Sequence, residues 1–168
     1  ITQVFTCGEE AAQWLVGEKL AQSAILQRNS IDTQVYAYSE VHRKEIREQL
    51  NIPMDAIVIG HVGRFNKQKN HAFLIDIFHA FVQEHPHAYL VLVGVGELME
   101  EMQAKVQRLQ LSKQVHFLGV RSDVPKLLHA MDLFLFPSFM EGLSVSMVEA
   151  QCAGLPCVVS DTIPTEVS

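Results

Sequence analysis

The sequence predicts a doubly wound α/β fold, in which helices cover both faces of a parallel β-sheet. Five short runs are almost continuously apolar, which is typical of parallel strands that are buried on both faces. Segments with helical apolar periodicity lie between these runs, as crossover connections between parallel strands require. A chain of 168 residues with 48% hydrophobic residues can bury a full core, so the composition excludes a disordered protein.

The predicted strands lie in the last two thirds of the chain. They cover residues 57–62, 89–93, 115–118, 133–136 and 157–160. In the common strand order 3-2-1-4-5, the first and fourth of these strands are neighbours, and the order reverses between them. Ligands bind at the carboxyl ends of the two strands that flank such a reversal. We therefore expect the ligand site between the loops at residues 63–70 and 137–144.

Four helices are predicted from capping residues and apolar spacing. Asn70 is a suitable N-cap for a helix that ends before Pro86, and residues 98–109 carry a second apolar stripe. Asp123 is expected to cap a short third helix. Residues 144–153 form the fourth, which a glycine and a proline bring to an end.

The first 55 residues fit the alternating pattern less closely. Residues 4–7 and 25–26 are candidate strands around a helix at residues 9–16, and residues 38–50 are charged and helical. We interpret this stretch as the tail of a preceding domain followed by a connector. The chain opens on Ile1 rather than on methionine, so we expect it to be a piece of a longer protein.

Charge and cysteine content narrow the possible functions. Nineteen acidic and thirteen basic residues give a net charge of −6, which offers no general electrostatic basis for binding nucleic acid. No apolar run approaches the roughly 18 residues that a membrane span needs. Cys7, Cys152 and Cys157 form no disulfide framework, so we expect a reducing cytosolic compartment. Cys152 and Cys157 have apolar neighbours and are expected to be buried thiols.

The loop at residues 63–70 concentrates positive charge in an acidic protein. Gly63 permits a sharp turn after the strand, and Arg64, Lys67 and Lys69 follow it. The planar guanidinium of Arg64 can bind two phosphate oxygens, and Lys69 can add a point charge. The alternative, a solvated basic loop, stays open at this level.

The loop at residues 137–144 leads into a helix whose free N–H groups and dipole favour an anion. Glu141 lies in this loop, and Glu149 lies two turns into the helix. Their alternative roles are a partner of the helix dipole for Glu141 and a solvated helix face for Glu149. Because carboxylates repel phosphate but bind hydroxyl groups, cations and carboxylates together suit a sugar nucleotide.

Sharper motifs are absent from the sequence. It contains no Walker-type phosphate loop and no His-Glu-x-x-His zinc motif. Gly94 and Gly96 lack the third glycine of a dinucleotide fingerprint. Ser144 is not expected to be a nucleophile, because Ser146 stands where a nucleophile elbow needs glycine. The eight histidines are scattered, and the two that flank Pro86 predict a solvated turn rather than a metal site.

These loops together resemble the signature of the family 4 retaining glycosyltransferases. The matching residues are Pro137-Ser138, Glu141-Gly142-Leu143, Glu149-Ala150 and Gly154-Leu155-Pro156. Gly63-Arg64-Phe65 with Lys69-Asn70 is similar to the family's phosphate-binding segment. Residues 29–32 resemble its Asn-Gly-Ile-Asp motif, with Ser30 in place of glycine, and residues 115–124 resemble its base-binding segment.

The resemblance implies the GT-B fold, in which two Rossmann-like domains face each other across a cleft, and an enzyme of the bacterial capsule or exopolysaccharide type. Residues 1–31 would be the tail of the N-terminal acceptor domain, and residues 32–55 a connector. Residues 56–168 would form the Rossmann-like domain that binds the nucleotide sugar, truncated at its C-terminal end. The fragment alone is expected to be inactive.

The resemblance also implies roles for the charged residues. Arg64 and Lys69, after the turn at Gly63, would hold the diphosphate of a nucleotide sugar. Glu149 would contact the ribose. Glu141 would contact the donor sugar as a positioning residue.

Backbone groups complete the implied donor site. The backbone N–H groups of Gly142, Leu143 and Ser144 would also bind the phosphates. The chain at Val120 and Arg121 would lie along the edge of the base.

The chemistry implied is transfer of a hexose to a glycan or lipid-linked acceptor. Positive charge stabilises the leaving diphosphate as its charge develops. No metal and no cofactor are expected, and the donor is expected to be a UDP-sugar rather than a GDP-sugar. The enzyme would work in the cytoplasm, with peripheral attachment to the inner face of the membrane. Another GT-B enzyme, such as an epimerase or phosphorylase, and a non-catalytic module of the same fold are the alternatives.

Overall fold

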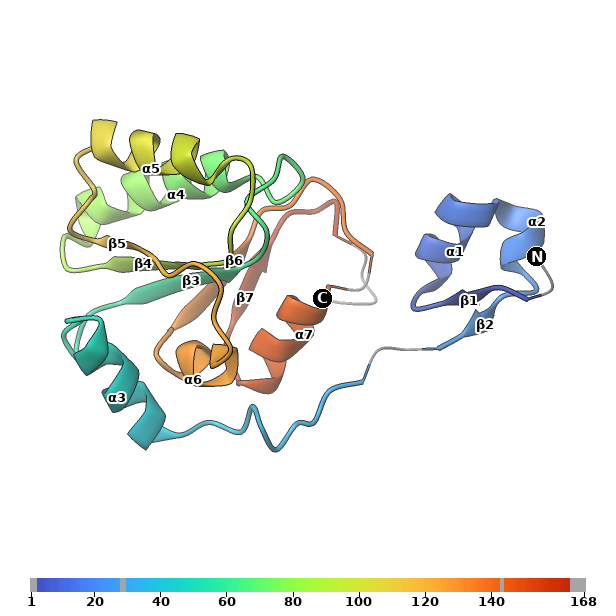
Figure 1. The fold of residues 1–168 in the computed structure, drawn as a ribbon, viewed down its shortest axis with the longest axis horizontal. Helices are drawn as coiled ribbons and strands as arrows, with labels where there is room; N and C mark the ends of the chain where they lie inside the picture. Colours follow the sequence, from blue (N-terminus) through green and yellow to red (C-terminus); the bar gives the residue numbers. More distant parts are fainter. Residues whose placement is uncertain (1–2, 28–29, 143, 164–168) are drawn as a thin grey trace.

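The computed structural model describes residues 3–27, 30–142 and 144–163 of the chain. Figure 1 shows a small N-terminal unit and a larger α/β domain, which an extended connector joins. The strands of the larger domain are β3 (Val58–Val62), β4 (Tyr89–Val93), β5 (Val115–Phe117), β6 (Leu133–Phe136) and β7 (Cys157–Val159). Each lies at a predicted position, so the strand predictions are confirmed.

These strands form one parallel sheet in the order β5-β4-β3-β6-β7. This is the predicted order 3-2-1-4-5. Gly60 of β3 is in register with Val91 of β4 on one side and with Phe134 of β6 on the other. The strand order therefore reverses between β3 and β6, as expected.

Helices cover both faces of the sheet (Figure 1). Helices α4 (His71–Glu84) and α5 (Met99–Arg108) lie on one face, and α3 (Glu40–Gln49), α6 (Val124–His129) and α7 (Val145–Cys152) lie on the other. Alternate residues of β4 enter the two cores: Leu90 and Leu92 pack with the first pair of helices, and Val91 and Val93 with the second group. Burial on both faces explains why the strand sequences are continuously apolar.

The two predicted capping side chains do not cap. Asn70 precedes α4 as expected, but it has a left-handed φ of 54° and makes no capping hydrogen bond. Asparagine tolerates this conformation better than most residues, so Asn70 serves to turn the basic loop into the helix. The carboxylate of Asp123 is engaged by Arg121 instead of the α6 backbone.

The charged segment before the domain is fixed to it by two arginines. Arg43 Nη2 lies 2.6 Å from Asp132 Oδ1, and Arg47 Nη2 lies 2.7 Å from Asp132 Oδ2. The same Oδ2 accepts a hydrogen bond from Val58 N at 2.8 Å. Arg47 is fully buried and also donates to the carbonyl groups of Pro53, Met54, Ala56 and Ala130. The helical part of the predicted connector therefore packs on the α/β domain through α3.

The N-terminal unit is a small β-α-β arrangement. Strands β1 (Phe5–Thr6) and β2 (Ile25–Leu26) pair in parallel, and α1 (Glu9–Val16) and a short α2 (Glu18–Ala21) connect them. The predicted strands and first helix are present, whereas α2 was not predicted. The domain boundaries drawn from the sequence remain predictions. Among the helices of the described residues, none has the length and apolarity to cross a membrane.

The Arg47–Asp132 pair generates a stability prediction. Replacing Arg47 with methionine should lower the free energy of unfolding by about 3 kcal/mol, because several buried carbonyl groups lose their donor and Asp132 loses one of its two arginine partners. Urea denaturation measures this loss. The matched control is Lys44→Met in the same helix, where the lysine is 67% exposed, and a change under about 0.5 kcal/mol is expected there. Equal losses in the two variants would contradict the role given to Arg47.

Candidate functional site

The loops that follow β3 and β6 meet at the carboxyl edge of the sheet. Phe139 N donates to Gln68 O at 2.9 Å, and Gln68 Nε2 donates to Met140 O at 2.8 Å. An ion pair between Lys69 and Glu141 completes the contact. The two loops thus lie together at the switch point of the sheet, where the sequence predicted the ligand site.

Lys69 and Glu141 are paired in a sheltered position. Lys69 Nζ lies 2.8 Å from Glu141 Oε1, and the two side chains are only 14% and 8% exposed. The ammonium group also lies 4.5 Å from the centre of the Phe136 ring, at the end of β6. An ammonium group has three N–H donors, so Lys69 can hold Glu141 and bind an anion at the same time.

Arg64 occupies a different environment in the same loop. Its side chain is 72% exposed, and its ion-pair partner is Glu97, with Nη2 3.4 Å from Oε2. A surface pair at this distance is weak, so the guanidinium can turn toward a ligand at little cost. The structure therefore brings Lys69 and Glu141 together but does not bring Arg64 into contact with them.

Gly63 and the Gly94–Gly96 turn allow close backbone contact beneath the basic loop. A Cβ atom at Gly94 would lie 2.1 Å from Gly63 O, and one at Gly96 would lie 2.4 Å from Phe65 O. Three backbone hydrogen bonds join the segments: Gly63 N to Val93 O, Phe65 N to Val95 O, and Leu98 N to Phe65 O. The two glycines that form no dinucleotide fingerprint thus support the candidate phosphate loop, a role that sequence reasoning missed.

Glu149 binds a residue of the connector. The hydroxyl of Tyr36 donates to Glu149 Oε1 at 2.6 Å. Burial of Tyr36 and this hydrogen bond raise the pKa of Tyr36 to about 12, so the hydroxyl keeps its proton at neutral pH. The two signature carboxylates therefore have different partners, Lys69 for Glu141 and Tyr36 for Glu149.

The loop after β5 joins the same edge of the sheet. Gly94 N donates to Gly119 O at 2.8 Å, which places this loop beside the Gly94–Gly96 turn. Val120 is 76% exposed, whereas Nε and Nη2, on one edge of the Arg121 guanidinium, donate to Asp123 at 2.7 and 2.6 Å. Val120 is thus open to a ligand, and the Arg121 side chain is engaged within the loop.

The helix that follows the second loop begins at the site. Ser144 is the N-cap residue of α7, is nearly buried, and has its Oγ 3.2 Å from Ser146 Oγ. Gly142 is exposed just before it, and Leu143 lies outside the described residues. The N-terminal end of α7, with its partial positive charge, therefore belongs to the loop that carries Glu141.

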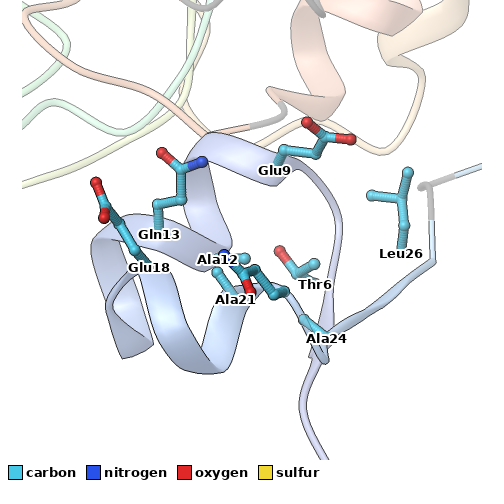
Figure 2. Close-up of a pocket in the computed structure, with 9 residues that line it drawn as sticks. Thr6, Glu9, Ala12, Gln13, Glu18, Ala21, Ala24 and Leu26 are labelled. Carbon is cyan, nitrogen blue, oxygen red and sulfur yellow. The ribbon is translucent and has the colours of Figure 1, made fainter.

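A groove of about 910 Å³ runs between these loops and α1. It is lined by Ala11, Trp14, Leu15, Lys67, Gln68, Phe139, Met140, Glu141, Gly142 and Thr162. A smaller cavity of about 400 Å³ lies inside the N-terminal unit, between its helices and strands (Figure 2). The groove contains Glu141 and Gly142 of the predicted site residues, whereas Lys69, Arg64 and Glu149 lie outside its lining. The smaller cavity contains none of them. The candidate ligand site is therefore the carboxyl edge of the sheet, and the groove adjoins it at Glu141.

Two buried histidines lie beneath the basic loop. His61 Nδ1 donates to Leu135 O at 2.8 Å, and its ring meets the ring of His71 edge-on at 4.8 Å. The Phe65 ring stacks on His71 at 4.0 Å. Burial, together with nearby positive charge, lowers the pKa of His61 to about 3 and that of His71 to about 4. The two histidines are separate in the sequence but in contact in the fold, and both are neutral near pH 7.

The described residues contain no group of three or more His, Cys, Asp or Glu side chains that could hold a metal ion. The positive charge at the site comes from Lys69, Arg64 and the end of α7. The site can therefore attract an anionic group beside carboxylates that accept hydroxyl hydrogen bonds.

The strand order and the helices on both faces define a Rossmann-like domain, and charged side chains meet at its switch point. The chain belongs to the group 1 glycosyl transferases, because the profile of that family matches residues 42–167. Its sequence is 36% identical over 168 residues to EpsF of Bacillus subtilis, which is named as a glycosyltransferase. It is 33% identical over 137 residues to the UDP-Gal:alpha-D-GlcNAc-diphosphoundecaprenol alpha-1,3-galactosyltransferase of Escherichia coli.

Solved structures agree with this assignment. The crystal structure of Anabaena HepE in complex with UDP-glucose has a TM-score of 0.84 and 29% identity over 96% of this chain. The present chain spans 45% of HepE, 44% of EpsF and 35% of the galactosyltransferase, which is less than half of each. The resemblance to one half of a GT-B glycosyltransferase is confirmed.

The buried histidines generate a pH prediction. Their pKa values in the folded state lie below the ordinary 6.5, so the unfolded chain binds protons first as the pH falls. Above about pH 6.5 the two histidines are neutral in the folded and unfolded states and cost no stability. By pH 5 each should lower the free energy of unfolding by roughly 2 kcal/mol, because the unfolded chain is protonated and the folded protein is not.

Unfolding by urea at pH 7 and pH 5 tests this expectation. His71→Phe should remove about half of the acid loss attributed to the pair, and His87→Phe, at an exposed position, is the control for loss of a histidine. A wild-type protein that is equally stable at both pH values would contradict the burial argument.

Proposed function

We propose that the protein is the donor-binding half of a family 4 retaining glycosyltransferase, which transfers a hexose from a UDP-sugar. The observation that carries this proposal is the Lys69–Glu141 pair at the switch point of the sheet. A sheltered cation beside a sheltered carboxylate matches a ligand that has phosphate next to sugar hydroxyl groups.

The phosphates are bound by Lys69, Arg64 and the N-terminal end of α7. As the bond between the anomeric carbon and the phosphate oxygen breaks, the electron pair stays on that oxygen, and the leaving diphosphate gains negative charge. Lys69 and Arg64 stabilise this charge as it develops, so they act on the transition state. The acceptor oxygen attacks from the same face of the sugar, and its proton passes to the leaving phosphate.

The rest of the donor is bound by neighbouring groups. Glu141 orients the sugar, Glu149 accepts hydrogen bonds from the ribose, and the backbone at Val120 and Arg121 edges the uracil. The solved structure of HepE is a complex with UDP-glucose, and the Escherichia coli relative is named for a UDP-Gal donor, which supports a uridine donor.

The acceptor is a glycan or a lipid-linked saccharide that binds to a second domain. The E. coli relative is named for a diphosphoundecaprenol acceptor. Exposed apolar side chains outside the groove in the N-terminal unit support the presence of further sheet and helices around it, and examples are Phe5, Leu20 and Ile25. We place the reaction in the cytoplasm, with the complete enzyme attached peripherally to the inner face of the membrane, and we expect the present chain alone to bind donor without turnover.

Binding of UDP by calorimetry tests the donor site. Arg64→Ala and Lys69→Gln should each weaken UDP binding by about tenfold or more, because each removes a charge-assisted hydrogen bond to phosphate. The binding of uridine, which has no phosphate, should change little. Lys113→Ala is the matched control, since Lys113 is exposed and precedes β5 at the opposite edge of the sheet. UDP affinity that is unchanged in both site variants, or a preference for NAD, would refute the proposal.

Metal removal gives a second test. Lys69 and Arg64 supply the positive charge that a divalent metal supplies in other transferases. Sugar transfer by the protein together with its acceptor-binding domain should therefore persist in excess chelator, as measured by release of UDP. Activity that disappears with the chelator and returns with Mg²⁺ or Mn²⁺ would overturn this part of the proposal.

A further inference from the structure

Tyr36 lies in the connector between the two units and reaches the donor domain. Its hydroxyl donates to Glu149 Oε1 at 2.6 Å, although the two residues are 113 positions apart in the sequence. The Tyr36 ring is partly buried against the core beneath α6 and α7. The connector is thus attached directly to a carboxylate of the candidate site.

The backbone of the connector is fixed at the same point. His129 Nε2, on α6, lies 3.3 Å from Tyr36 O, and the His129 ring meets the Tyr38 ring edge-on at 5.9 Å. Tyr36 N donates to Thr33 O at 3.3 Å, which forms a turn immediately before the contact. Contacts with α6 and α7 therefore hold the segment around Tyr36 on the domain, and the contact with α7 is the one made by Glu149.

A carboxylate held by one neutral donor keeps its second oxygen for a ligand. The Tyr36 hydroxyl, which is protonated at neutral pH, donates its hydrogen bond to Oε1 of Glu149. Oε2 can then accept a hydrogen bond from a hydroxyl group. A carboxylate fixed in one orientation loses less side-chain entropy when the ligand binds.

We propose that Tyr36 is a positioning residue for the donor nucleotide, which holds Glu149 in the orientation that receives the ribose and thereby couples the connector to occupancy of the donor site. This inference rests on the proposed function, because there Glu149 contacts the ribose. Coupling is reciprocal: if the connector orients Glu149 for the ribose, then a bound ribose strengthens the hold of Glu149 on the connector.

The test compares UDP with its 2′-deoxy and 3′-deoxy analogues by calorimetry. Tyr36→Phe keeps the ring and removes only the hydroxyl, so it should weaken UDP binding by about fivefold to tenfold. This is less than the loss of a direct hydrogen bond between a charged group and the ligand, because Tyr36 acts through Glu149. Binding of the deoxy analogue whose missing hydroxyl Glu149 contacts should change little. The preference for UDP over that analogue should therefore fall in Tyr36→Phe, as it should in Glu149→Gln.

Tyr38→Phe is the matched control. Tyr38 lies two residues away in the same connector, and its hydroxyl bonds to the exposed Glu40 rather than to the site. This variant should bind UDP and the analogues as the wild type does. A Tyr36→Phe variant that keeps the wild-type preference, or that loses affinity equally for UDP and both analogues, would overturn the inference.

Hydrogen exchange tests the coupling directly. The amide groups of Val35, Tyr36 and Ala37 donate to carbonyl groups three residues earlier in the connector. UDP should slow their exchange in the wild type and in Tyr38→Phe, but not in Tyr36→Phe. Exchange that UDP does not alter in the wild type would refute the coupling. If the wild type does not bind UDP, the proposed function itself is refuted, and this inference falls with it.

Discussion

The parallel pairing of β3 with β6 is the constraint on which the rest of the site depends. These two strands are neighbours in the sheet although the chain between them forms two other strands and three helices. Their pairing brings the loop with Lys69 against the loop with Glu141. Helix α7 begins directly after the second loop, so its N-terminal end lies beside them. If β3 and β6 were not neighbours, the loops that follow them would still end at the carboxyl edge of the sheet, but other strands would separate the cation from the carboxylate.

Charged residues serve two separate purposes in this domain, and their exposure distinguishes them. Arg47 is fully buried, and its donors are taken up by backbone carbonyl groups and Asp132, so it can bind no ligand. Arg64 is mostly exposed and weakly paired, so it can turn toward an anion. Lys69 is intermediate between these two arginines: its side chain is largely buried, but only one carboxylate, that of Glu141, pairs with it. Stability thus depends on one member of a small set of cations, and the recognition proposed above depends on others.

The order of the strands and the two loops of the site could be predicted from the sequence, because both follow from apolar runs and the rule for parallel sheets. Contacts between distant residues could not. His61 and His71 look unrelated in sequence, and only the fold stacks them under the basic loop. The Gly94–Gly96 turn does not match the dinucleotide-binding pattern. Only the structure shows that these glycines allow the backbone of Gly63 and Phe65 to approach closely. Nothing in the sequence around Tyr36 indicated its hydrogen bond, because its partner Glu149 lies on a helix 113 residues later in the chain.

The groove at the switch point contains the single tryptophan of the chain. Trp14 is 77% exposed on α1, on the wall opposite the loop that carries Glu141. An indole ring in this position changes its fluorescence when water around it is displaced, and no second indole contributes to the emission. The protein therefore has an intrinsic optical probe at the mouth of its own groove, and what enters there can be followed without an added label.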